Sequence, residues 1–235
     1  MRPKPSLPIL FATAVLAVCP LSAQATVDPS MLAAPADDAE IERLRATGPG
    51  GVFGRVEQSV VHVRVEVAGP RGTFAIERAS SGVVVDASGL VLTWHHLVRE
   101  AEGASDKQLL VQRNDAGNTR VPAKVVAIDE ATGLVLLRLE GTEQLPFVPL
   151  GPDRPQPGQP TLVVARPEGK EMLAFAGVAS AALADVALRG HTVPAGDLFL
   201  TDSRNDERCD GAPVFDHEGR LLGLYAAEHV QCDKS

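Results

Sequence analysis

The sequence predicts an all-β protein, and three of its features lead to this fold class. From Val60 onward, short runs rich in β-branched residues alternate with turn-forming Gly, Pro, Asp and Asn, a pattern typical of β-sandwiches and β-barrels. A Pro-rich stretch, GPDRPQPGQP at 151–160, lies midway and indicates a linker between two halves. Apolar residues make up 45% of the 235 residues, which is enough for a substantial core.

The individual elements can be placed in order along the chain. The predicted strands of the first half include 59–67, 81–86, 90–94, 109–113, 123–129 and 134–140. Those of the second half include 160–166, 198–202, 213–215 and 220–227. Before the strands, Asp37 or Asp38 can cap a short helix that continues to about Ala46. The glycine-rich TGPGG at 47–51 ends this helix, and it is no nucleotide-binding loop because no strand precedes it.

The first 25 residues have the features of a secretory signal peptide. Arg2 and Lys4 precede an apolar run at 7–18 that is too short for a stable transmembrane helix. The small-residue motif that follows predicts cleavage after Ala25. A weaker lipoprotein-like motif makes lipidation at Cys19 the alternative. We expect a periplasmic or secreted protein that begins with a leader at 26–51, rich in Ala and Pro and ending in the short helix.

Charge and aromatic content exclude two classes of partner. Cleavage removes two of the 22 basic residues and none of the 30 acidic residues, so the net charge changes from −8 to −10. A surface of this charge repels phosphate backbones and anionic lipids, so we expect no nucleic-acid partner and no membrane partner. One Trp and one Tyr do not make a platform on which nucleic-acid bases stack.

Three segments carry ordered motifs. They are SSGVVVDASGLVLTWHHLV at 80–98, AIDEATGLVLLRLE at 127–140 and TDSRNDERCDGAPVFDHEGRLLGL at 201–224. Taken together they resemble the trypsin-fold serine proteases of the HtrA (Deg) type. That family has a Leu-Thr-x-x-His motif, then Asp-x-x-Thr-Asp-Leu, then Thr-Asp followed at a fixed distance by Gly-Asn-Ser-Gly-Gly-Pro. The resemblance covers about residues 52–228.

The resemblance implies a domain organisation. It predicts two six-stranded antiparallel β-barrels, at about 52–145 and 155–228, within a trypsin-like peptidase domain at 52–235. Many relatives carry a C-terminal PDZ domain, but the few residues after 228 leave no room for one, so we expect none. Some relatives form trimers, and this sequence is compatible with a monomer or with a homo-oligomer.

Of four positions that the family's chemistry requires, one is retained. His96 matches the histidine that acts as general base. Gly133 stands where the family has the aspartate that orients the histidine, and Asp210 stands where it has the nucleophilic serine. Arg208 replaces the glycine whose N–H helps to hold the oxyanion. The resemblance and these replacements predict a homologue without serine endopeptidase activity.

Nearby residues do not restore the missing groups. Asp129 and Glu130 belong to the turn before the strand at 134–140 and should point elsewhere. Ser203 is seven residues from the nucleophile position, too far to fill the same site. We expect no cofactor and no metal, because the histidines have no ligand-like local spacing.

Three functions are compatible with these observations. The first is an exported pseudoprotease that retains a peptide-accommodating cleft and binds a peptide or protein partner. The second is an active serine endopeptidase whose triad uses residues other than those aligned above. The third is a structural or surface-interaction module with no ligand in the cleft. Labelling with a fluorophosphonate distinguishes the second from the others, since it reports an activated serine.

Two side-chain pairings follow from the expected fold. His96 and Asp210 should contact each other between the barrels, because an aspartate reaches one atom further than the serine it replaces. Cys209 and Cys232 remain after signal cleavage, and an even pair in an exported chain predicts one disulfide. The two cysteines flank the loop at Asp210 and the neighbouring strand at 220–227, and the disulfide would stabilise the fold by about 3 kcal/mol.

Two other histidines are expected to have no catalytic role. His62 alternates with apolar residues in a predicted strand and is expected to be structural. His95 should point away from His96 if the segment is extended, and we expect it at the surface or behind His96.

Overall fold

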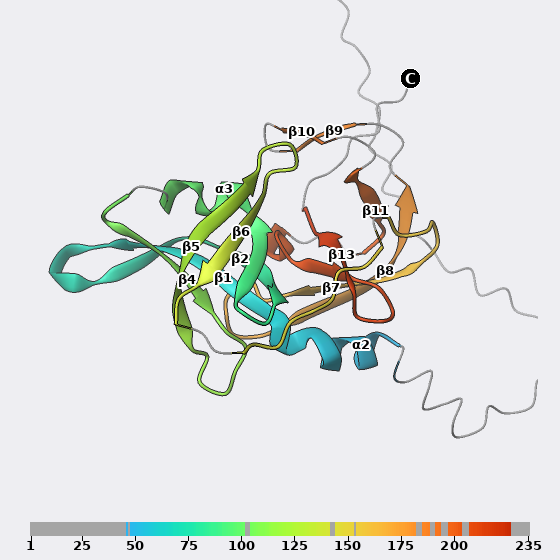
Figure 1. The fold of residues 1–235 in the computed structure, drawn as a ribbon, viewed down its shortest axis with the longest axis horizontal. Helices are drawn as coiled ribbons and strands as arrows, with labels where there is room; N and C mark the ends of the chain where they lie inside the picture. Colours follow the sequence, from blue (N-terminus) through green and yellow to red (C-terminus); the bar gives the residue numbers. More distant parts are fainter. Residues whose placement is uncertain are drawn as a thin grey trace, which may run out of the picture. The chain divides into compact units, whose positions relative to one another are not determined.

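The computed structural model describes residues 46, 48–101, 104–141, 144–152, 154–181, 185–188, 191–193, 197–203 and 207–226. They consist mainly of β-strands in a closed barrel and a second, curled sheet (Figure 1). The predicted signal peptide, nearly all of the leader, and Cys232 lie outside the described residues. The fold class predicted from the sequence is confirmed.

Six strands close into the first barrel, and every pairing in it is antiparallel. In barrel order they are β1 (Val60–Ala68), β2 (Phe74–Asp86), β3 (Leu90–Trp94), β6 (Leu134–Leu139), β5 (Arg120–Asp129) and β4 (Lys107–Gln112), which pairs back with β1. Alternate β-branched residues fill the interior: Val61, Val63 and Val65 of β1 are buried together with Leu137 of β6. The first predicted barrel is therefore present.

Five strands form the second sheet. In sheet order they are β11 (Phe199–Thr201), β8 (Leu173–Ala181), β7 (Pro160–Ala165), β12 (Pro213–Phe215) and β13 (Leu221–Leu224). The strands β9 (Val186–Leu188) and β10 (His191–Val193) pair only with each other among the described residues. The sequence led us to expect six strands in a barrel here, whereas the described part of this half is a curled five-stranded half-barrel.

The helices are short. They are α2 (Pro49–Val56), η2 (Glu57–Ser59), η3 (Pro70–Gly72), α3 (His95–Val98), η4 (Arg99–Ala101) and η6 (Glu207–Cys209). The glycine-rich TGPGG was expected to end a helix, and α2, which was not predicted, begins within it. Pro49 suits a first helical position because its missing N–H has no partner there in any case. Val52 and Val56 then pack into the core beside Phe215. No helix in the described residues is long and apolar enough to cross a membrane.

Hydrogen bonds connect the first barrel to the second sheet. The Ser81 hydroxyl oxygen on β2 accepts a hydrogen bond from the Arg166 N–H just after β7, at 2.8 Å. The Trp94 indole at the end of β3 donates to the Tyr225 carbonyl after β13, at 3.1 Å. A third bond joins Ser80 to the loop at Asp210. These contacts hold the two halves together where the predicted site residues lie.

Candidate functional site

His96 is positioned by the abrupt end of β3. Trp94 closes the strand, and the chain turns at once into α3. The peptide N–H of His95 donates to the Gly133 carbonyl at 2.8 Å, which holds the start of α3 beside the start of β6. Of the two places expected for His95, the surface is ruled out, because the segment is helical rather than extended there and His95 is buried.

Asp210 lies in a tight turn between η6 and β12. Its carbonyl accepts a hydrogen bond from Ser80 Oγ at 2.5 Å. The next residue, Gly211, has a φ of +73° and donates its N–H to the Tyr225 carbonyl at 2.9 Å. The peptide group that follows Asp210 is thus hydrogen-bonded to both halves of the fold, which restricts the direction of the Asp210 side chain.

The side chains of His96 and Asp210 meet. His96 Nε2 lies 3.3 Å from Asp210 Oδ2, and the two side chains are 28% and 13% exposed. This confirms the predicted contact. One partner comes from the first barrel and the other from the loop before β12, so the pair lies between the two halves and remains open to solvent.

Gly133 ends the turn in which the Asp129 carboxylate is hydrogen-bonded. Its N–H donates to the Asp129 carbonyl at 2.7 Å. The Asp129 carboxylate accepts hydrogen bonds from the Thr132 hydroxyl at 2.6 Å and from the Ala131 N–H at 3.0 Å. The Thr132 hydroxyl bond lowers the pKa of Asp129 below its usual range. As expected from the sequence, Asp129 serves its own turn.

The other residues considered from the sequence differ in how deeply they are buried. Arg208 lies in η6 and is exposed, whereas the adjacent Cys209 is buried. Ser203 is buried, with its Oγ 2.9 Å from Thr201 Oγ1. Sequence reasoning missed Ser80, whose hydroxyl holds the Asp210 carbonyl. The only signal for Ser80 was its place at the start of the first motif.

The disulfide stays a prediction, because Cys232 lies outside the described residues. Cys209 packs in an apolar cluster with Val214 and Tyr225, close to the chain that leads toward Cys232. We expect peptide mapping of the exported protein without reductant to recover Cys209 and Cys232 in one linked fragment. Recovery of both as separate thiol peptides under oxidising conditions would contradict the pairing.

Gly211 is expected to be required for the site's backbone. A Cβ there would lie 2.8 Å from the Ser81 carbonyl oxygen and would also meet Ser80 Oγ, and a positive φ is unfavourable for alanine. We expect Gly211→Ala to lower the free energy of unfolding by about 2–4 kcal/mol, measured by urea denaturation.

A second glycine separates the two causes of this loss. Gly158 has a φ of +82° but no atom within 4 Å of an added Cβ. Gly158→Ala is therefore expected to cost about 1 kcal/mol, from backbone strain alone. An equal loss in the two variants would show that the contact with β2 is unimportant.

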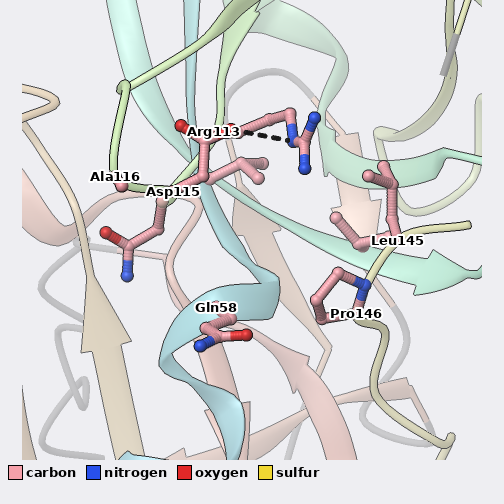
Figure 2. Close-up of a pocket in the computed structure, with 9 residues that line it drawn as sticks. Gln58, Arg113, Asp115, Ala116, Leu145 and Pro146 are labelled. Atoms are coloured by element: carbon pink, nitrogen blue, oxygen red, sulfur yellow. Dashed lines mark ion pairs between the residues drawn. The ribbon is translucent and has the colours of Figure 1, made fainter. Parts of the chain in front are cut away.

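A cavity of about 270 Å³ lies at the first barrel (Figure 2). Val61, Val84, Leu145 and Pro146 give it apolar walls, and the turn after β4 forms its polar side together with Gln58. In that turn Arg113 Nε lies 3.4 Å from Asp115 Oδ2. None of the predicted site residues lines this cavity. A second cavity, of about 420 Å³, is lined by residues of α3, η4, β4 and β5.

Comparisons of the sequence find a protein family and two groups of relatives. The family model of the trypsin-like peptidase domain matches residues 80–224. The magnetosome formation protease MamE of Paramagnetospirillum magneticum is 30% identical over 156 residues, which cover 66% of this chain and 21% of MamE. A probable periplasmic serine endoprotease, DegP-like, of Pseudomonas putida is 30% identical over 162 residues, which cover 66% of this chain and 31% of that protein. The chain thus spans less than a third of either relative.

Two solved structures have a similar fold. The crystal structure of Deg5 matches with a TM-score of 0.62 and 22% identity, covering 81% of this chain and 87% of Deg5. The MamO protease domain from Magnetospirillum magneticum, in its apo form, matches with a TM-score of 0.59 and 24% identity, covering 73% of this chain and 85% of that domain.

Proposed function

The chain belongs to the trypsin-like peptidase family, and we propose that it is an exported HtrA-type homologue that binds a peptide or protein without cleaving it. The observation that carries this proposal is the 3.3 Å contact between His96 Nε2 and Asp210 Oδ2. In an active serine protease the histidine contacts a serine hydroxyl and takes its proton. Here the histidine faces a carboxylate, which is not a nucleophile for peptide bonds in combination with histidine.

The surroundings of His96 support the same proposal. Gly133, next to the start of α3, has no side chain with which to orient the imidazole. The Asp129 carboxylate is occupied within its own turn. The hydroxyls of Ser80 and Ser203 are both buried and engaged in hydrogen bonds, with the Asp210 carbonyl and with Thr201 respectively. Ser80 of the first motif and Ser203 of the third are therefore held in structural contacts.

Binding and export rest on other observations. The His96–Asp210 pair lies between the two halves with both side chains partly exposed, which supports contact with an extended peptide there. The sequence features of residues 1–25 indicate export. The DegP-like relative is described as periplasmic, which agrees with this location. The net negative charge favours a neutral or basic partner over an acidic one.

The absence of cleavage is tested with a fluorophosphonate probe and casein. The purified chain is expected to take up no label and to leave casein intact over hours, while an active DegP-like protease, run in parallel, is labelled and degrades casein. Labelling of any serine would overturn the proposal, and mapping the labelled peptide would identify the nucleophile of an active enzyme.

Binding is tested separately, by fluorescence anisotropy of labelled casein peptides. We expect saturable binding that is lost in Asp210→Lys, because a longer, positive side chain replaces the carboxylate between the two halves. Asp106→Lys makes the same charge change at an exposed position in the turn before β4 and is expected to leave binding intact. No binding by the unchanged protein, or equal losses in both variants, would contradict peptide binding at this site.

A further inference from the structure

A buried polar cluster joins the first barrel to the turn after β7. His62 of β1 and Gln112 of β4 belong to the barrel, and Arg166 and Gly169 belong to the turn. His62 and Arg166 are each 1% exposed. This cluster lies at a boundary between the two halves, and nothing in the proposed function uses it.

The barrel and the turn are joined in this cluster by direct hydrogen bonds and by close packing. His62 Nδ1 donates to the Arg166 carbonyl at 3.0 Å, and Gln112 Nε2 donates to the Gly169 carbonyl at 2.6 Å. Gly169 has a φ of +68°, and a Cβ on it would lie 2.9 Å from His62 Cδ2. The turn is therefore packed against the edge of the imidazole, so closely that a Cβ at position 169 would not fit without a shift.

The Arg166 side chain adds further hydrogen bonds that hold the turn against the barrel. Its guanidinium donates to the Gly169 carbonyl at 3.0 Å, to the Gln112 carbonyl at 3.4 Å, and to the side-chain oxygen of Asn118. Burial lowers the pKa of Arg166, and the charge of Asp115 opposes that change. A buried cation thus lies beside His62 and is bonded mainly to neutral groups.

The charges around His62 make its protonated form unfavourable. Arg64 on the same strand, Arg120 on β5 and Arg166 on the turn are all positive. Burial is the largest cause that lowers the pKa of His62 from 6.5 to about 4, and the three arginines act in the same direction. The hydrogen bond to the Arg166 carbonyl opposes them. Among the described residues, Glu66 pairs with Arg64 and offsets part of this positive charge.

We propose that this cluster is an acid-released joint: protonation of His62 expels the imidazole from its place beside Gly169 and frees the turn at 166–169 from the first barrel. The geometry supplies the mechanism, since a charge on the buried ring beside the guanidinium and the turn makes the closed arrangement less stable relative to one in which the ring is hydrated. His96 and Asp210 come from the two sides of the same boundary, so release of the joint would also loosen their contact.

The direction and size of the pH effect follow from proton linkage. The closed joint holds a neutral ring, and the open joint exposes a ring that protonates near pH 6.5. Opening therefore takes up one proton, and the ratio of open to closed protein rises as pH falls from about 6.5 to about 4. The total increase, from well above pH 6.5 to well below pH 4, is about 300-fold, and about half of it is reached at pH 4.

The single tryptophan is a reporter of this boundary. Trp94 is 9% exposed and donates to the Tyr225 carbonyl across it. On titration of the full chain from pH 7.5 to 4, we expect a reversible red shift of its emission. Amide exchange in peptides that cover 62 and 166–169 should increase over the same range, while far-ultraviolet circular dichroism stays constant.

Two variants and one further measurement make the test decisive. His62→Gln keeps an amide that can donate to the Arg166 carbonyl but cannot be protonated, so it is expected to remove the transition. His217→Gln changes a half-exposed histidine and is expected to retain it. If His62→Gln does not fold, proton NMR of the unchanged protein serves instead: the His62 ring signals must titrate together with the Trp94 shift.

Three results would overturn the proposal. The first is a Trp94 emission and a 166–169 exchange rate that stay constant down to pH 4. The second is an unaltered transition in His62→Gln. The third is a loss of secondary structure in the same pH range, which would show global unfolding rather than release of one joint.

Discussion

Replacing Asp210 by serine alone is expected to leave casein hydrolysis at least about 10⁴-fold below that of an active serine protease of this fold. The new hydroxyl would lie next to His96, in the place that the carboxylate now occupies. Position 133 would still carry no carboxylate, and loss of the group that fixes the histidine tautomer lowers kcat by about 10⁴-fold.

The oxyanion site adds a second defect to this variant. Arg208, in η6, would remain where the family has the glycine whose N–H holds the oxyanion. Loss of one such donor lowers kcat by about 10²–10³-fold. The two losses need not multiply, because triad members act as a unit, and either alone brings turnover near the limit of a casein assay.

The control for this prediction is Asp210→Asn, which removes the charge and adds no hydroxyl. We expect Asp210→Ser and Asp210→Asn to be indistinguishable in rates of fluorescent casein cleavage, with an active DegP-like protease as reference. Cleavage by Asp210→Ser at the reference rate would mean that Gly133 is not the vacant aspartate position and that another carboxylate orients His96.

The strands that sequence reasoning found are those with a distinct composition. β1, β3 and β6 are rich in Val and Leu, and their predicted bounds agree with the structure to within about one residue at each end. β8 was missed because its sequence, LAFAGVASA, is rich in Ala, which has little preference for strands. α2 was missed because glycine usually ends helices, whereas Pro49 and buried valines determine this one.

The functional residues also divide into those that sequence motifs predicted and those that only the structure brings together. The contact of His96 with Asp210 could be predicted because ordered motifs place both residues on a known scaffold. The cluster around His62 could not, because it brings together residues from β1, β4 and the turn after β7 that no motif connects. In the sequence, Arg166 is one basic residue at a strand end, and only tertiary packing buries it.

Restoring three positions together, with Gly133→Asp, Arg208→Gly and Asp210→Ser, is expected to raise casein cleavage by about 10⁴-fold over Asp210→Ser. The Gly133 carbonyl accepts the His95 N–H at 2.8 Å, so a carboxylate at 133 starts beside the helix that carries His96. The same variant is expected to react with a fluorophosphonate, which Asp210→Ser should not do at a measurable rate.

This gain has an opposing cost in stability. Gly133 has a φ of +75°, a conformation that is unfavourable by about 1–2 kcal/mol for a residue with a Cβ. Aspartate and asparagine tolerate it better than other residues, because their short side chains hydrogen-bond locally. We therefore expect the triple variant to fold, with a free energy of unfolding lowered by about 1–2 kcal/mol in urea denaturation.

The matched control replaces Gly133 by asparagine in the same triple variant. Asparagine has the size of aspartate and tolerates the positive φ equally well, so the loss of stability should be the same. It cannot stabilise a positively charged imidazole, and in serine proteases this exchange selects the wrong histidine tautomer. The asparagine variant is therefore expected to cleave casein no faster than Asp210→Ser. Equal activity of the aspartate and asparagine variants would show that position 133 does not orient His96, and that the missing part of the triad lies elsewhere in the chain.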